Sequence, residues 1–150
     1  YFGGKDQLLV EVLKTMSDRY TEAMGDLSRN VTSEQFMEAA LDQPFARTTE
    51  MPEWYRLRYE LFALGLHNPT LAPGLRDLLT SGRTAIGKAI SQVQQSSGVA
   101  SSADQSALAS LLLATFDGLA LQKIMDPAMD LDAAYQLLVQ MIRSLPGSEK

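Results

Sequence analysis

The sequence predicts an all-α protein, a bundle of about six helices that dimerises through the last two. Apolar residues recur at spacings of three and four along most of the chain, which is the helical period. No stretch shows the sustained alternation of a strand, and prolines, glycines and capping residues divide the chain into segments of helical length. With 150 residues, 45% of them hydrophobic, the chain has the size of one globular domain.

The composition excludes several classes of protein. The formal net charge of -5 argues against general nucleic-acid binding by this part of the chain, because phosphate binding needs a concentrated cationic surface. There is no cysteine, and hence no disulfide, thiolate metal site or cysteine nucleophile. We see no signal peptide and no apolar run near the roughly 20 residues of a membrane helix, since Asp117 interrupts the best candidate. These features predict a cytoplasmic protein without membrane contact.

The first helix is expected to run from Lys5 to about Leu27, after a break at Gly3-Gly4. Its apolar residues fall on one face, in steps of four and three: Leu9, Leu13, Met16, Tyr20, Ala23 and Leu27. Because the helix is long and only about half apolar, it could connect two bodies.

Two shorter helices follow. Thr32 with Gln35 forms a plausible capping box for a helix that we expect to stop before Pro44, leaving residues 44–51 as a loop. Pro52 then sits in the first turn of a helix over about Pro52–His67, where its missing N–H costs least. This helix has the highest aromatic density in the chain.

The last three helices are predicted at about Pro73–Gln95, Ala103–Met125 and Leu131–Leu145. Ser101-Ser102 with Gln105 resembles a capping box for the fifth, and Asp130 caps the sixth.

The last two helices carry more apolar surface than one modest core can cover, because residues 111–121 are apolar nearly all round. We therefore expect a second subunit to cover the remainder. The sixth helix has two apolar stripes, one through Tyr135 and the other through Leu137, and the sequence leaves open which one faces the partner. The candidate interface residues are Leu112, Phe116, Leu119, Tyr135, Leu138 and Ile142.

Asp117 lies inside the most apolar helix and admits two interpretations. It belongs either to a polar strip beside Ser110 and Thr115 or to a paired buried group that fixes the register of the dimer.

Signals for catalysis or metal binding are weak. The single histidine, His67, stands at a helix end without spaced partners. The acidic residues Glu50, Glu53 and Glu60 alternate with arginines, as on a solvated helix face. We therefore predict no catalytic residue, no metal site and no cofactor.

Aromatic and methionine side chains on the first and third helices suit either a core or an apolar ligand cavity with polar tips. The chain has 7 methionines, many for an ordinary core, and Arg58 with the tyrosines could orient a ligand. The candidate ligand-binding residues are Met16, Tyr20, Met24, Trp54, Tyr55, Arg58, Tyr59 and Phe62.

Three stretches resemble the TetR/AcrR family of transcriptional repressors. Residues 1–9, Tyr-Phe-Gly-Gly-Lys-Asp-Gln-Leu-Leu, resemble the segment in which that family leaves its DNA-recognition helix. Residues 64–71 resemble its helix break before the long hairpin helix, and residues 111–145 resemble its last two helices.

The resemblance implies a repressor of which residues 1–4 are the end of a helix-turn-helix domain and residues 5–150 the ligand-binding and dimerisation domain. Tyr1 and Lys5 would contact DNA phosphates. The implied partners are a second subunit, operator DNA bound through the missing N-terminal domain, and a small apolar or aromatic effector that releases the DNA. The alternative is a helical scaffold or adaptor that docks a protein partner and has no DNA role.

Overall fold

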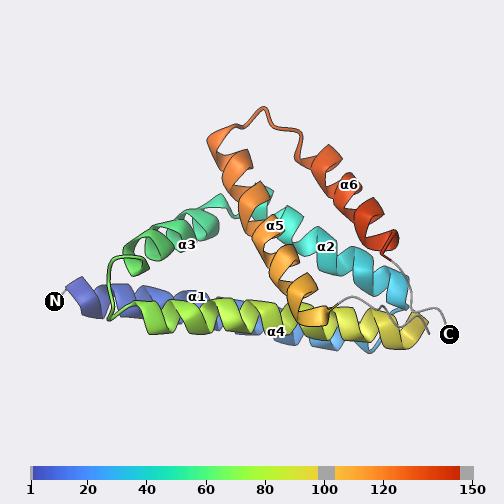
Figure 1. Cartoon of the computed structure of the whole chain (residues 1–150), viewed down its shortest axis with the longest axis horizontal. Coiled ribbons are helices and arrows are strands. Elements are labelled where there is room, and N and C mark those ends of the chain that lie inside the picture. The colour runs from blue at the N-terminus through green and yellow to red at the C-terminus, as the bar shows by residue number, and fades with distance from the viewer. Residues whose placement is uncertain (1, 98–103, 146–150) are drawn as a thin grey trace.

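The computed structural model describes the backbone of residues 2–97 and 104–145, and their side chains except at positions 2, 3, 20, 24, 27, 28, 33, 96 and 97. These residues form six helices and no strand, which confirms the predicted all-α fold (Figure 1). The helices are α1 (Phe2–Ser28), α2 (Ser33–Glu50), α3 (Pro52–Gly65), α4 (Ala72–Ser97), α5 (Gln105–Met125) and α6 (Leu131–Arg143).

The two longest helices, α1 and α4, lie side by side and run in the same direction along one edge of the molecule (Figure 1). Helix α3 rises from this pair at one end, while α2, α5 and α6 lie over the remainder, with α5 packed against α4. The result is a three-sided frame rather than a parallel bundle.

The frame has two hydrophobic cores. The first joins α1, α3 and α4, and its buried members are Val10, Leu13, Leu61, Leu71, Leu75 and Leu78. The second joins α2, α5 and α6, and its buried members are Leu41, Leu112, Phe116, Leu131, Tyr135 and Leu138. Burying one such side chain contributes roughly 1.5–3 kcal/mol.

Helix α2 corrects the prediction that a helix stops before Pro44 and leaves residues 44–51 as a loop. It continues through the proline to Glu50, although an interior proline removes one backbone hydrogen bond. The Pro44 carbonyl accepts a hydrogen bond from the Thr48 hydroxyl at 2.8 Å, and Leu41 and Phe45 on either side pack into the second core. Tertiary packing thus overrides the local signal.

The helix starts differ in detail from the predictions. Helix α1 begins at Phe2 and passes through Gly3-Gly4 instead of starting at Lys5, because glycine weakens a helix without ending it. Helix α5 begins at Gln105, and the Asp104 carboxylate accepts hydrogen bonds from two backbone N–H groups; positions 101–103 lie outside the described residues. The capping box of Thr32 with Gln35 and the Asp130 cap are confirmed.

Helix α5 is long and apolar enough, by length and composition alone, to cross a membrane, which corrects the expectation that no stretch reaches this limit. A helix between a core and a second apolar contact has the same composition. Its residues Leu112 and Phe116 lie in the second core, whereas Leu111 and Leu121 are exposed on other faces.

Candidate ligand cavity

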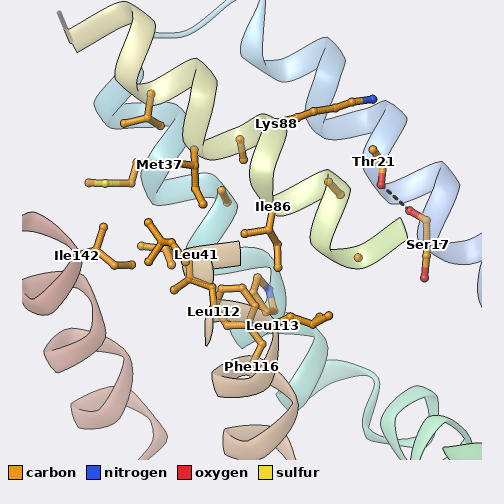
Figure 2. A pocket seen from close by; sticks show the side chains of 18 of the residues that line it. Ser17, Thr21, Met37, Leu41, Ile86, Lys88, Leu112, Leu113, Phe116 and Ile142 are labelled. Carbon is orange, nitrogen blue, oxygen red and sulfur yellow. Dashed lines mark hydrogen bonds between the residues drawn. The ribbon is translucent and has the colours of Figure 1, made fainter. Parts of the chain in front are cut away.

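A cavity of about 580 Å³ lies where the two hydrophobic cores meet. All six helices contribute to its wall, and the side chains in Figure 2 converge on it from α2, α4, α5 and α6. Most of this wall is apolar, with Leu78 from the first core and Leu41, Leu112 and Phe116 from the second. The volume and the apolar wall are typical of small-molecule sites.

One part of the cavity wall is polar, and we call it the polar wall: Arg47, Trp54, Tyr55, Arg58 and Asp117. At its centre, Arg58 donates from Nε to Asp117 Oδ1 and from Nη2 to Asp117 Oδ2, both at 3.0 Å. The side chains of Arg58 and Asp117 are 4% and 22% exposed, so the pair is largely removed from water. Such two-point contact with a carboxylate is the geometry that favours arginine over lysine.

Aromatic rings hold the two arginines of the polar wall. The Arg47 guanidinium lies 4.5 Å from the centroid of the Trp54 ring, and that of Arg58 lies 5.4 Å from the same ring. Arg58 also lies 4.6 Å from the ring of Phe62. These distances are within the range of cation–π attraction. Trp54 in turn meets Tyr55 edge to face, with ring centroids 4.8 Å apart.

Two tyrosines keep their protons at neutral pH. The Tyr59 hydroxyl donates to the backbone carbonyl of Asp117 at 2.5 Å. Burial and the nearby Asp117 carboxylate raise the pKa of Tyr59 above its usual range. Burial likewise raises the pKa of Tyr55, against the opposing effect of Arg47. The polar wall therefore presents the neutral phenol of Tyr55 beside charged guanidinium groups.

The ion pair corrects the first interpretation of Asp117 and part of the second. The residue is a paired and largely buried group, not one on a polar surface strip, but its partner, Arg58, belongs to the same chain and not to a second subunit. Sequence periodicity could not reveal this pair, since it joins positions 59 residues apart.

Only some of the predicted ligand-binding residues line the cavity. Trp54, Tyr55 and Arg58 line the cavity, whereas Tyr59 and Phe62 support Arg58 and Asp117 without being lining residues. Met16 is 36% exposed and is not a lining residue. The side chains of Tyr20 and Met24 lie outside the described residues.

The sequence analysis missed most of the apolar wall, which comes from α2, α4 and α5. Met37, Ile86 and Leu113 line the cavity together with residues assigned to the dimer interface, namely Leu112, Phe116 and Ile142 (Figure 2). The small residues Gly82 and Ala85 of α4 were the available signal, since they leave room for a cavity beside the helix.

The burial of the predicted interface residues requires a further correction. Leu112, Phe116, Tyr135 and Leu138 are buried within one chain, and Leu119 and Ile142 pack against them. Leu112, Phe116, Tyr135 and Leu138 therefore belong to the interior of one chain, while a contact of the partly buried Leu119 and Ile142 with a second subunit stays a prediction. The exposed apolar side chains of α5 and α6 lie on other faces, which we call the outer face: Leu111, Leu121, Met125, Leu137 and Met141.

The remaining predicted residues have simple surroundings. Lys5 is exposed near the start of α1, and Tyr1 lies outside the described residues. Within the described ranges, no three His, Asp or Glu side chains are grouped so that they could hold a metal ion.

Comparison with known proteins identifies one family. Residues 33–147 match the C-terminal domain of BetI-type transcriptional repressors. A crystal structure of a transcriptional regulator from Rhodococcus sp. Rha1 has a similar fold, with a TM-score of 0.68 and 23% identity over 95% of this chain and 89% of that one. No curated protein matches the sequence.

Proposed function

We propose that this chain, which belongs to the family of BetI-type transcriptional repressor C-terminal domains, binds a small effector. Binding of the effector would control whether the repressor binds DNA. The observation that carries the proposal is the cavity of about 580 Å³, apolar on most sides and closed on one by the polar wall. We propose no catalytic role, because the family consists of transcriptional repressors.

We further propose that the protein acts as a dimer through the outer face of α5 and α6. Leu111 and Leu121 of α5, with Leu137 and Met141 of α6, are large apolar side chains exposed on the last two helices. An exposed apolar patch of this kind usually marks a contact with another protein. A second copy of the chain would cover it with the same residues of its own.

Helix α1 is the proposed connection between effector and DNA. Ser17, Thr21 and Gly25 of α1 line the cavity, so an effector would touch this helix directly. By the family resemblance, residues 1–4 would be the end of a DNA-binding domain, and Tyr1 and Lys5 would contact DNA phosphates. An effector that prefers one position of α1 would shift the spacing of two DNA-binding domains, by no more than its differential affinity.

The function is tested with protein made from the complete reading frame. We expect selection from a pool of random DNA duplexes to enrich an inverted repeat, with half-sites about one helical turn apart. A protein that acts on DNA in this way would be located in the cytoplasm. Failure to enrich any sequence would contradict a repressor and favour the second candidate, an adaptor, which is supported only by the exposed apolar side chains of α5 and α6.

A further inference from the structure

We infer that the cavity takes an amphipathic organic anion, whose anionic head lies against Arg47 and Arg58 and whose apolar body lies along α2, α4 and α5. The inference deepens the proposed effector site by naming the chemistry of its ligand. It rests on the charges that face the cavity, on the geometry of the Arg58 ion pair, and on the two guanidinium groups that lie over the Trp54 ring.

The charged residues of the cavity wall are mostly cationic. Among the described lining residues they are Arg47, Arg58, Lys88, Arg143 and Asp117. Lys88 is exposed and extends from α4 toward α1, away from Phe116 (Figure 2). Arg143 pairs at the surface with Glu34 at 3.4 Å. Two guanidinium groups and one carboxylate therefore set the charge of the polar wall, which gives it a positive sum.

The Arg58 ion pair leaves one nitrogen of a cavity-lining guanidinium outside it. Asp117 binds Nε and Nη2 of Arg58, and the third nitrogen, Nη1, takes no part in that pair. A guanidinium has five N–H donors, of which the pair uses two. A ligand carboxylate beside Nη1 and the Arg47 guanidinium would form charge-assisted hydrogen bonds in a site of low dielectric constant.

The same wall is unsuited to a cationic ligand. The face of an aromatic ring is the usual seat for an organic cation, but the Trp54 ring already has the guanidinium groups of Arg47 and Arg58 at 4.5 Å and 5.4 Å. A cation placed there would be repelled by both. The side chains of Glu50, Glu53 and Glu60 are exposed and do not line the cavity, so they cannot offset this repulsion.

The apolar part of the wall defines the body of the ligand. Leu41 of α2, Ile86 of α4 and Phe116 of α5 line the cavity from three helices, and all three belong to the second core or pack against it (Figure 2). They can surround an alkyl chain or ring but offer it no hydrogen bond. A molecule without a polar end would leave the polar wall facing an apolar surface, which costs binding free energy.

Three probes with one decyl chain and different heads test the inference: decanoate, decanol and decyltrimethylammonium. They are titrated into the complete protein by calorimetry, below their micelle-forming concentrations. We expect decanoate to bind at least about tenfold more tightly than decanol, because the two guanidinium groups attract its carboxylate. We expect decyltrimethylammonium to bind most weakly, because the same groups repel its positive charge. Equal affinity for the three heads, no binding of any of them, or a preference for the cation would overturn the inference.

A pair of variants locates the charge effect. Arg47→Gln and Lys88→Gln remove the same charge from residues of the same cavity, but only Arg47 belongs to the polar wall. We expect Arg47→Gln to reduce the preference for decanoate over decanol by about tenfold, and Lys88→Gln to leave that preference unchanged. An equal loss in both variants would mean that general electrostatic attraction is responsible, which would contradict a built anion site.

The result can be separated from the fate of the proposed function. If decanoate binds with the expected selectivity but the protein enriches no DNA, the anion site stands and the repressor proposal falls. If the protein enriches an inverted repeat but shows no preference for decanoate, the repressor proposal stands and the inference about ligand charge falls.

Discussion

Arg58 and Asp117 form a two-point ion pair that fastens α3 to α5 across the polar side of the cavity. Tyr59, the residue after Arg58, donates a hydrogen bond to the backbone carbonyl of Asp117. Two successive residues of α3 therefore bind the same residue of α5. Helix α5 also carries part of the outer face, including Leu121 one turn further along. The pair therefore joins the cavity directly to the helix that we propose for dimerisation.

Breaking this pair on one side should strongly destabilise the protein. Asp117→Leu leaves the buried Arg58 cation without its carboxylate, and we expect the free energy of unfolding to fall by about 3 kcal/mol. The double variant Arg58→Met with Asp117→Leu replaces both charges by apolar groups, and should recover to within about 1 kcal/mol of the unchanged protein. Urea denaturation of the three proteins measures both values.

The exposed pair of Arg56 with Glu53 provides the control, since both side chains lie at the surface of α3. Glu53→Leu should change the stability by less than about 1 kcal/mol, because water screens such pairs. Equal effects of Asp117→Leu and Glu53→Leu would mean that the Arg58 pair is not the fastening described above.

Charges on the outer face should prevent dimerisation without unfolding the chain. Leu137 and Met141 are both 57% exposed on α6, so glutamate at either position meets water in the monomer but not in a dimer. We expect the unchanged protein to be a dimer in sedimentation velocity, and Leu137→Glu with Met141→Glu to be monomeric at the same concentration. Circular dichroism should show unchanged helix content.

Leu66→Glu serves as the matched control, because Leu66 is an exposed leucine (81%) outside α5 and α6. It should leave the dimer intact. A dimer that persists in the α6 variant, or one that Leu66→Glu also dissociates, would count against the outer face.

Local sequence signals predicted where most helices lie in the chain, but not which helices pack against one another. The caps at Thr32 and Asp130 could be predicted because each involves residues within a single turn. The interior Pro44 could not, because the packing of Phe45 against Tyr135 outweighs it from 90 positions away. Local signals decide a helix end only where no tertiary contact opposes them.

The candidate site divides in the same way. The aromatic density of α3 led to Trp54, Tyr55 and Arg58, which do line the cavity. Helical periodicity could not decide which apolar face of α5 is buried, since Phe116 and Leu121 belong to equally apolar stripes. The opposing wall from α4 was missed because Ile86 resembles any core residue until the helices are placed in space.

Filling the cavity should prevent binding of an apolar probe whatever its charge. Ala85 lines the cavity on α4, and Ala85→Phe would occupy part of its volume. We expect the affinity for the neutral dye N-phenyl-1-naphthylamine, followed by its fluorescence, to fall at least about tenfold. Ala63→Phe, on an exposed position of α3, should leave it unchanged. Equal dye binding by both variants would place the dye, and the proposed effector, outside this cavity.

The raised pKa of Tyr59 makes the stability sensitive to alkaline pH. Its usual pKa is 10.0, and burial with the Asp117 carboxylate raises the pKa in the folded protein. As the pH rises past about 10, the unfolded chain releases this proton first. The free energy of unfolding therefore falls with pH in this range, whereas Tyr59 adds nothing to its pH dependence at lower pH, where both states are protonated.

The variant Tyr59→Phe isolates this contribution, because lysines and other tyrosines titrate in both proteins. At pH 7 the variant should be less stable by about 1 kcal/mol, since the Asp117 carbonyl loses its hydrogen bond. Above pH 10 the difference should shrink, because only the unchanged protein must keep a phenol protonated beside a carboxylate. Denaturation by urea between pH 7 and 11 measures the difference, and a gap that is constant or widens with pH would contradict the buried, neutral state of Tyr59.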